Sequence, residues 1–125
     1  MDTSNMTGNT LSKEERISDK SSILRLVKSG HYGKIPGMRY CFFEGNGLGF
    51  NRIIISVPKK FFKRAVKRNF LKRRIREAYR KQKSLVERKG IDMMFFYGQK
   101  EILTSTAIYE NIGRILNEIN GQKSE

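Results

Sequence analysis

One segment constrains this chain more than any other. Residues 59–83 carry 13 of its 26 Lys and Arg residues and a single acid, Glu77. Like charges at helical spacing cost about 0.2–0.5 kcal/mol per pair. In a helix of mixed sign such charges would be read as a solvated face, but solubility does not require so unequal a balance. The segment therefore predicts a helix that binds a polyanion.

On a helical wheel this segment separates into faces. We expect the helix to begin at Arg64 or Ala65 and to end at Arg88, before Gly90. An apolar stripe would face the core, formed by Leu71, Ile75, Ala78, Tyr79, Leu85 and Val86. A polar face follows at steps of three or four, formed by Asn69, Lys72, Arg73, Arg76, Arg80 and Lys83. A thinner line of cations lies on the other flank of the stripe, formed by Lys67, Arg74 and Lys81.

The overall charge limits the classes of partner. A net charge of +14 and a pI near 10.2 attract phosphate backbones or anionic membrane surfaces. No apolar run approaches the roughly 18 residues of a membrane span, and residues 1–10 lack a signal pattern. The lone Cys41 excludes internal disulfides and the usual multi-cysteine zinc sites. We expect a cytoplasmic protein with a disordered tail at 1–10, one domain at 11–120 and a polar tail at 121–125.

The remaining elements follow from periodicity and breakers. Ser12 and Glu15 have capping-box spacing and favour a short helical turn. Ser18 or Asp19 can cap a helix that ends at Ser29, before Gly30. The breakers in 31–37 predict a loop, and Thr104–Thr106 can cap a last helix that stops at Asn120-Gly121. Strands are expected at 39–44, 52–57 and 91–97. Strand–helix–strand order around the basic segment predicts a crossover over a sheet.

Two stretches carry a resemblance to a known family. Residues 65–80 (AVKRNFLKRRIREAYR), preceded by 55–60 (ISVPKK), resemble the signature segment of the bacterial ribonuclease P protein subunit. That family has an Arg-Asn-Arg block, a Lys-Arg pair, and then Arg-Glu/Gln-Ala-Phe/Tyr. Arg16-Ile17, ahead of Ile23, also resembles its N-terminal pattern.

The resemblance implies both fold and function. The fold would be an α+β sandwich of order α-β-β-(β)-α-β-α, with a four-stranded mixed sheet and a left-handed crossover. The protein would bind a catalytic RNA and the 5′ leader of precursor tRNA, and would assist endonucleolytic removal of the leader. The active site and its Mg²⁺ would belong to the RNA, so no catalytic residue, metal or cofactor is expected on this chain. Neither a membrane nor a protein partner would be required.

Candidate site residues divide into two groups. The catalytic RNA would be bound by Lys59, Lys60, Arg64, Lys67, Arg68, Asn69, Lys72, Arg73, Arg76 and Arg80. Arginine suits this role because its guanidinium can bind two phosphate oxygens at once. Asn69 could equally tie down the loop before the helix. The leader would be bound by Arg16, Ile23, Val27, Tyr40 and Phe42.

This chain departs from the family pattern at two places. Phe70 replaces the last arginine of the Arg-Asn-Arg block, and lies off the apolar stripe, so it is either exposed or stacked on another group. Ile23 and Val27 occupy positions where the family often has Phe. Tyr40 and Phe42, alternating on one strand face, could replace those rings as stacking platforms or could belong to the core. Cys41 and Phe43 would then point to the core, although the assignment of the two sides could be reversed.

Three other functions fit these residues less well. A generic basic RNA-binding or ribosome-associated module shares the composition but not the spacing in 64–80. A membrane-surface helix is weakened because strands cover its apolar stripe. A free-standing nuclease is least favoured, because Asp19, Glu44 and Asp92 lack paired-carboxylate or metal-ligand spacing. His31, the lone histidine, is expected to be a loop residue.

Overall fold

A computed structural model describes residues 11–122, so the tail expected at 1–10 and residues 123–125 lie outside it. The chain is a mixed α+β fold, as expected. Its helices and strands are α1 (Lys20–Ser29), β1 (His31–Ile35), β2 (Met38–Glu44), β3 (Arg52–Ser56), α2 (Ala65–Gln82), β4 (Ile91–Tyr97) and α3 (Ser105–Gly121). Single 3-10 turns precede α1 (η2, Lys13–Glu15) and follow α2 (η3, Lys83–Leu85). No helix in the described range is long and apolar enough to cross a membrane.

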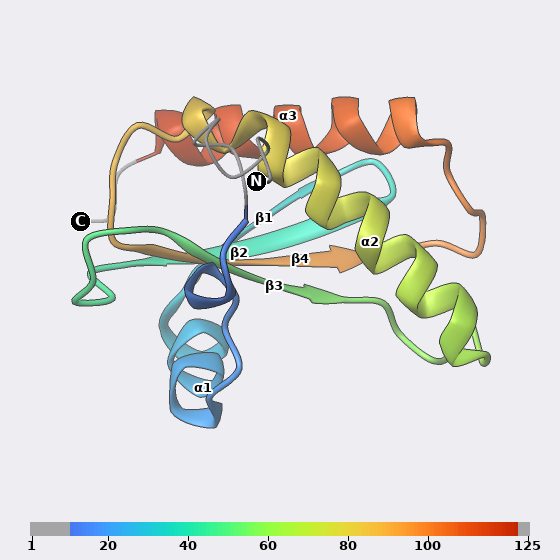
Figure 1. The fold of residues 1–125 in the computed structure, drawn as a ribbon, viewed down its shortest axis with the longest axis horizontal. Coiled ribbons are helices and arrows are strands. Elements are labelled where there is room, and N and C mark those ends of the chain that lie inside the picture. Colours follow the sequence, from blue (N-terminus) through green and yellow to red (C-terminus); the bar gives the residue numbers. More distant parts are fainter. Residues whose placement is uncertain (1–10, 123–125) are drawn as a thin grey trace, which may run out of the picture.

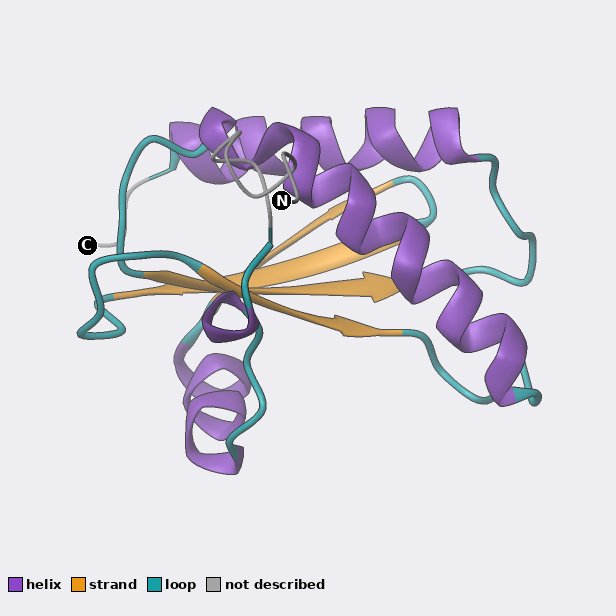
Figure 2. Cartoon of the chain, in the orientation of Figure 1, coloured by secondary structure: helices purple, strands orange, loops and turns teal. Residues whose placement is uncertain are grey.

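The four strands form one mixed sheet in the order β1-β2-β4-β3. β2 pairs antiparallel with β1 and with β4, whereas β3 and β4 are parallel neighbours joined through α2. α2 and α3 lie over one face of the sheet and α1 lies under the other (Figure 1). In the same view α1 covers only the end of the sheet where β3 and β4 begin (Figure 2).

Most apolar side chains lie between the sheet and the α2–α3 pair. The predicted stripe of α2 is confirmed there, because Leu71, Ile75, Ala78 and Tyr79 are all buried. A smaller cluster under α1 is formed by Ile17, Leu26, Cys41 and Met94. Both faces of the central strands are therefore apolar, which explains the continuous hydrophobic run of β4.

Residues 31–37, expected to be a loop, instead contain edge strand β1. Ile35 and Met38 pair directly, so Pro36 and Gly37 form a two-residue connection. Gly37 has φ +83°, a conformation that glycine adopts without strain at the third position of a turn. Gly33 lies opposite Tyr40, where a Cβ would meet the Tyr40 ring at 2.3 Å. Glycine is therefore needed where β1 crosses that ring.

Other boundaries also differ from expectation. α2 ends at Gln82, six residues before the expected Arg88, and a 3-10 turn carries the chain on to Val86. Val86 is buried as predicted, but Leu85 is exposed. Asp19 caps α1 by accepting a hydrogen bond from the Ser22 amide, and Gly30 ends the helix.

The N-terminal segment covers part of the outer edge of the sheet at β3. Arg16 forms a parallel bridge with Ile53 of β3, and the Ile17 amide donates to the Ile53 carbonyl at 2.9 Å. Its neighbour η2 forms as a short turn, but the Ser12 side chain makes no capping hydrogen bond. The capping-box spacing therefore placed the turn correctly and its capping contact wrongly.

A buried ion cluster attaches α1 to the sheet. Asp92 of β4 has no exposed surface, and Arg52 of β3 binds it with two nitrogens at 2.8 and 2.9 Å. Arg25 of α1 donates to Asp92 at 3.3 Å, and Arg52 also donates to the Ser22 hydroxyl at 3.0 Å. The hydrogen bonds that Arg52 donates to Asp92 raise the pKa of Arg52 above its ordinary value. Asp92 is thus a structural carboxylate.

We predict that Asp92→Asn lowers the free energy of unfolding by about 3 kcal/mol, because it leaves the Arg52 charge with only the more distant, exposed carboxylate of Asp19, 3.6 Å away. Urea unfolding monitored by circular dichroism measures this loss. Glu77→Gln, which breaks an exposed pair with Arg80, is the control and should cost about 1 kcal/mol or less. Equal effects of the two variants would contradict the assigned role of Asp92.

Candidate nucleic-acid interface

The cations of α2 face away from the apolar stripe that anchors the helix. Lys67 and Arg73 are exposed, and Lys72 and Arg76 are half-buried. Within residues 11–122 none of these four side chains forms an ion pair with an acid of the chain. Four neighbouring positive charges therefore remain to be neutralised by something else.

The N-terminus of α2 adds to this positive field. Its first turn contains no acid, and Arg64 at the N-cap position makes no side-chain capping hydrogen bond. A helix N-terminus carries a partial positive charge and usually attracts acidic residues. Lys59, Lys60 and Arg64 are exposed at this end, and the Lys60 nitrogen lies 5.1 Å from the Phe61 ring centroid.

Arg68 organises the loop before α2. One guanidinium nitrogen of Arg68 donates to the carbonyls of Phe62 at 2.9 Å and Lys63 at 2.8 Å. The role of tying down this loop, one of the two alternatives considered for Asn69, is thus filled by its neighbour Arg68, while Asn69 is exposed. Arg68 can still present its remaining donors to a ligand.

A hollow of about 190 Å³ opens between the N-terminal segment, β3 and α2. Three cations line it, Arg16, Lys72 and Arg76, together with isoleucines and no acid. Burial, and then the charges of Arg16 and Arg73, lowers the pKa of Arg76. Arg16, predicted to bind the leader, therefore joins the cations of α2. An anion in this hollow would relieve their repulsion.

The chain's own acids pair with cations near the C-terminal end of α2. Arg80 binds Glu77 at 2.5 Å, and Lys83 binds Glu15 at 2.7 Å. Arg80, which was predicted to bind RNA, shares its charge with Glu77, and its contact with RNA stays a prediction. The α2 cations without an ion pair in the described range therefore concentrate at Lys67, Lys72, Arg73 and Arg76, with Arg16 beside them. We call this group the unpaired surface of α2.

Phe70 and Arg74 form a stacked pair. The guanidinium carbon of Arg74 lies 4.3 Å from the Phe70 ring centroid, and one of its nitrogens donates to the Leu103 carbonyl at 2.5 Å. Phe70 is 38% exposed and also stacks on Arg74, so both alternatives considered for it are observed at the same time. The ring that replaces the family's arginine thus positions a neighbouring cation.

Tyr40 and Phe42 cannot line a groove, which corrects the prediction that they bind the leader. Each is 1% exposed and lies in the main core under α3. The Tyr40 hydroxyl donates to Glu118 at 2.7 Å and accepts from Gln122 at 3.2 Å. The exchanged assignment is the one observed, with Cys41 and Phe43 on the α1 side.

The uncovered end of the α1 side carries a row of four side chains, which we call the open row. Strand register places Lys34 beside Arg39, Arg39 beside Phe96, and Phe96 beside Ser56. Lys34 and Arg39 are exposed, and the other two are half-exposed. The Arg39 guanidinium lies 5.4 Å from the Phe96 ring centroid. Cations next to an accessible ring suit a single-stranded nucleic acid.

Sequence analysis did not select any member of the open row. Two α1 residues predicted to bind the leader lie on this side of the sheet: Ile23 is half-buried against the small core, and Val27 is exposed. The charge of Arg39 was the available signal, since a lone arginine marks the solvent side of a strand. Glu44, in phase with Tyr40 and Phe42, gave the opposite signal.

Burial, and then the hydrogen bond to Glu118, raises the pKa of Tyr40 to about 12. An unfolded tyrosine titrates near pH 10. The stabilisation from the neutral hydroxyl should therefore be complete below pH 10 and lost as the pH rises through 12. We predict that the stability advantage of the wild type over Tyr40→Phe shrinks between pH 10 and 12 in urea unfolding. A constant advantage would indicate a solvent-accessible hydroxyl.

Comparisons with known proteins agree with this geometry. The family model described as Ribonuclease P matches residues 11–120. The chain belongs to the ribonuclease P protein family. A ribonuclease P protein component from Borrelia hermsii is 36% identical over 110 residues, covering 86% of this chain and 91% of the relative. One from Thermotoga petrophila is 30% identical over 118 residues, covering 90% and 97%.

Solved structures of ribonuclease P proteins have the same fold. The Thermotoga maritima protein superposes with a TM-score of 0.72 at 26% identity, covering 88% of this chain and 99% of that one. The Staphylococcus aureus protein gives 0.74 at 26% identity, covering 84% and 94%. The chain is thus a ribonuclease P protein component, an accessory subunit of an endoribonuclease that processes tRNA. Residues 11–122 contain no group of three or more His, Cys, Asp or Glu able to hold a metal ion.

Proposed function

We propose that this ribonuclease P protein binds the catalytic RNA of ribonuclease P through α2 and the 5′ leader of precursor tRNA along the open row. The observation that carries the first part is the unpaired charge of Lys67, Lys72, Arg73 and Arg76, with Arg16 beside them. Each phosphate received there would replace cation repulsion with attraction and would release counterions from the RNA.

The two surfaces suit different states of RNA. The face of α2 presents charge without accessible rings apart from Phe70, which fits the backbone of a folded RNA. The open row combines Lys34 and Arg39 with the Phe96 ring, which fits unstacked bases of a single strand. A folded RNA and a single-stranded leader would therefore occupy opposite sides of one sheet.

The chemistry is assigned to the RNA partner in this proposal. The catalytic RNA would hold Mg²⁺, which activates water and stabilises the leaving oxygen. The residues of this chain would position the leader and screen the repulsion between two RNA molecules. The protein would act in the cytoplasm without a membrane or a further protein partner.

We predict that replacing Lys72, Arg73 and Arg76 together by Gln weakens binding to the catalytic RNA and flattens its salt dependence. The slope of log affinity against log salt should fall by about 0.7–0.9 per lost phosphate contact. Arg114→Gln on α3 removes one exposed charge and is the control. Filter binding over a salt series measures the slope, and precursor tRNA cleavage by the reconstituted enzyme measures function.

Two outcomes would overturn this assignment of α2. One is a triple variant with wild-type affinity and salt slope. The other is cleavage of precursor tRNA at the holoenzyme rate by the purified protein without RNA. Because the substitutions remove like-charge repulsion, the variant should unfold at the wild-type temperature or higher.

The open row is tested separately. We predict that Arg39→Gln with Phe96→Leu lowers holoenzyme affinity for precursor tRNA about tenfold, since stacking contributes ~1–3 kcal/mol per base. Affinity for mature tRNA, which lacks the leader, should not change. Tyr109→Leu on α3 is the matched control for loss of an exposed ring. Equal losses for precursor and mature tRNA would contradict leader binding at this row.

A further inference from the structure

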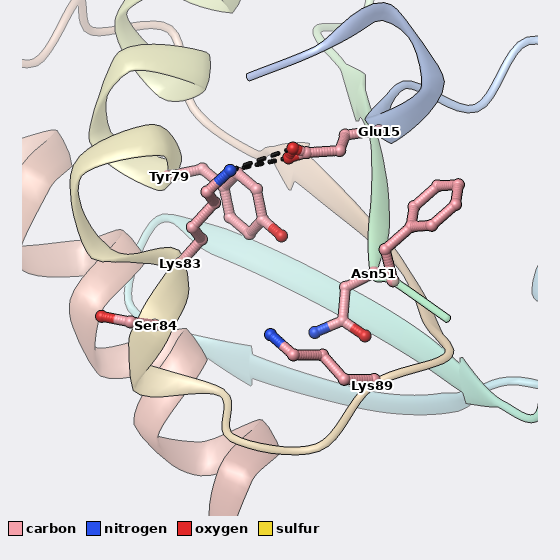
Figure 3. A pocket seen from close by; sticks show the side chains of 7 residues that line it. Glu15, Asn51, Tyr79, Lys83, Ser84 and Lys89 are labelled. Carbon is pink, nitrogen blue, oxygen red and sulfur yellow. Dashed lines mark hydrogen bonds and ion pairs between the residues drawn. The ribbon is translucent and has the colours of Figure 1, made fainter. Parts of the chain in front are cut away.

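A second pocket lies beyond the C-terminal end of the unpaired surface of α2. It encloses about 280 Å³ between η2, the start of β3, the end of α2 and the segment that follows η3. Figure 3 shows its lining side chains converging from these separate parts of the chain. Its volume lies just below the ~300–1,000 Å³ of pockets for drug-sized ligands, so it suits one nucleotide-sized group.

The Tyr79 hydroxyl is the unexplained group in this pocket. Tyr79 is 2% exposed, and its ring packs against Phe95 with centroids 6.1 Å apart. Its hydroxyl forms no hydrogen bond with another described residue, and it reaches open space, since it is not one of the fully buried atoms that lack a partner. Figure 3 shows it directed into the space between the Lys83–Glu15 pair and the side chains of Asn51 and Lys89. Burial, and then the Glu15 charge, raises the pKa of Tyr79, which keeps it a neutral donor.

The other polar side chains give the pocket a positive balance. Lys83 is held by both Glu15 oxygens, at 2.7 and 2.9 Å, so that pair is close to neutral. Lys89 is exposed and forms no ion pair within the described range. The Asn51 amide donates to the Arg88 carbonyl and accepts from the Ile91 amide, both at 2.9 Å. Asn51 thereby fixes the segment that carries Lys89.

We propose that this pocket receives one nucleotide of the RNA bound by α2, with its phosphate held by Lys89 and the Tyr79 hydroxyl. An ammonium group and a neutral hydroxyl donor together suit a phosphate oxygen. Phe50, which also lines the pocket, supplies an aromatic wall for the sugar or base. This inference rests on the proposed function and extends the RNA contact past the paired residue Arg80.

The test uses Tyr79→Phe and Lys89→Gln in the reconstituted ribonucleoprotein. Tyr79→Phe removes only a hydroxyl without an intramolecular partner, so the fold and its stability should be preserved. Tyr109→Phe and Arg114→Gln on α3 are the matched controls. We expect each test variant to weaken binding to the catalytic RNA about tenfold. Lys89→Gln should also lower the salt slope by about 0.7–0.9.

Free ligands separate the possible sources of the phosphate. In the RNA-free protein, the NMR signals of the Tyr79 ring should shift on addition of uridine 5′-monophosphate, and less with inorganic phosphate. Uridine, which lacks the phosphate, should cause no shift, and Lys89→Gln should abolish the response to the nucleotide. Equal shifts with uridine and its monophosphate would overturn the phosphate assignment.

The remaining outcomes are also decisive. If the wild type and both variants bind the catalytic RNA alike, the pocket takes no part in that contact and this inference fails alone. A nucleotide response in the free protein would then indicate a site for free nucleotides instead. If the wild type itself fails to bind the RNA, the proposed function fails and this inference fails with it.

Discussion

Repulsion among the cations of α2 is the constraint on which the rest of the molecule depends. Lys67, Lys72, Arg73 and Arg76 lie within three helical turns, and none of the ion pairs among residues 11–122 includes them. The helix nevertheless forms, because Leu71, Ile75 and Tyr79 bury its opposite side against the sheet. Burying each such side chain contributes roughly 1.5–3 kcal/mol, which exceeds the few tenths lost per repelling pair. The apolar stripe thus holds the charges together until a polyanion arrives.

The helices and strands of this fold could be predicted from the sequence where their local signal was strong. Basic content, the β-branched run of β3, and the caps of α1 and α3 placed those elements nearly correctly. β1 was missed because Gly33, Pro36 and Gly37 are breakers in isolation, and only the pairing with β2 makes them a hairpin. α2 was predicted too long because its periodicity continues to Val86, although the backbone tightens into a 3-10 turn at Lys83.

The sequence predicted which helix carries the cations of the candidate site, but not which side chains face solvent or which cations pair with acids. Cation spacing identified α2. The i,i+3 spacing of Glu77 and Arg80 was a signal for their pairing that went unused, whereas nothing in the sequence showed that Arg16 lies beside Arg76. The side of β2 that faces solvent could not be decided, because Arg39 and Glu44 occupy alternate phases of one strand. The Asp92 cluster depends on residues from three elements meeting, so its components looked unrelated in the sequence.

The bridge between Arg16 and Ile53 has a consequence for the assembled particle. While the protein is free, its charge of +14 keeps copies apart by mutual repulsion. A bound RNA would cancel that repulsion, and an uncovered strand edge would then be able to pair with the same edge of another copy. The bridge covers part of the β3 edge with the chain's own backbone. The segment that brings Arg16 beside Arg76 therefore also leaves less of the β3 edge open to such pairing.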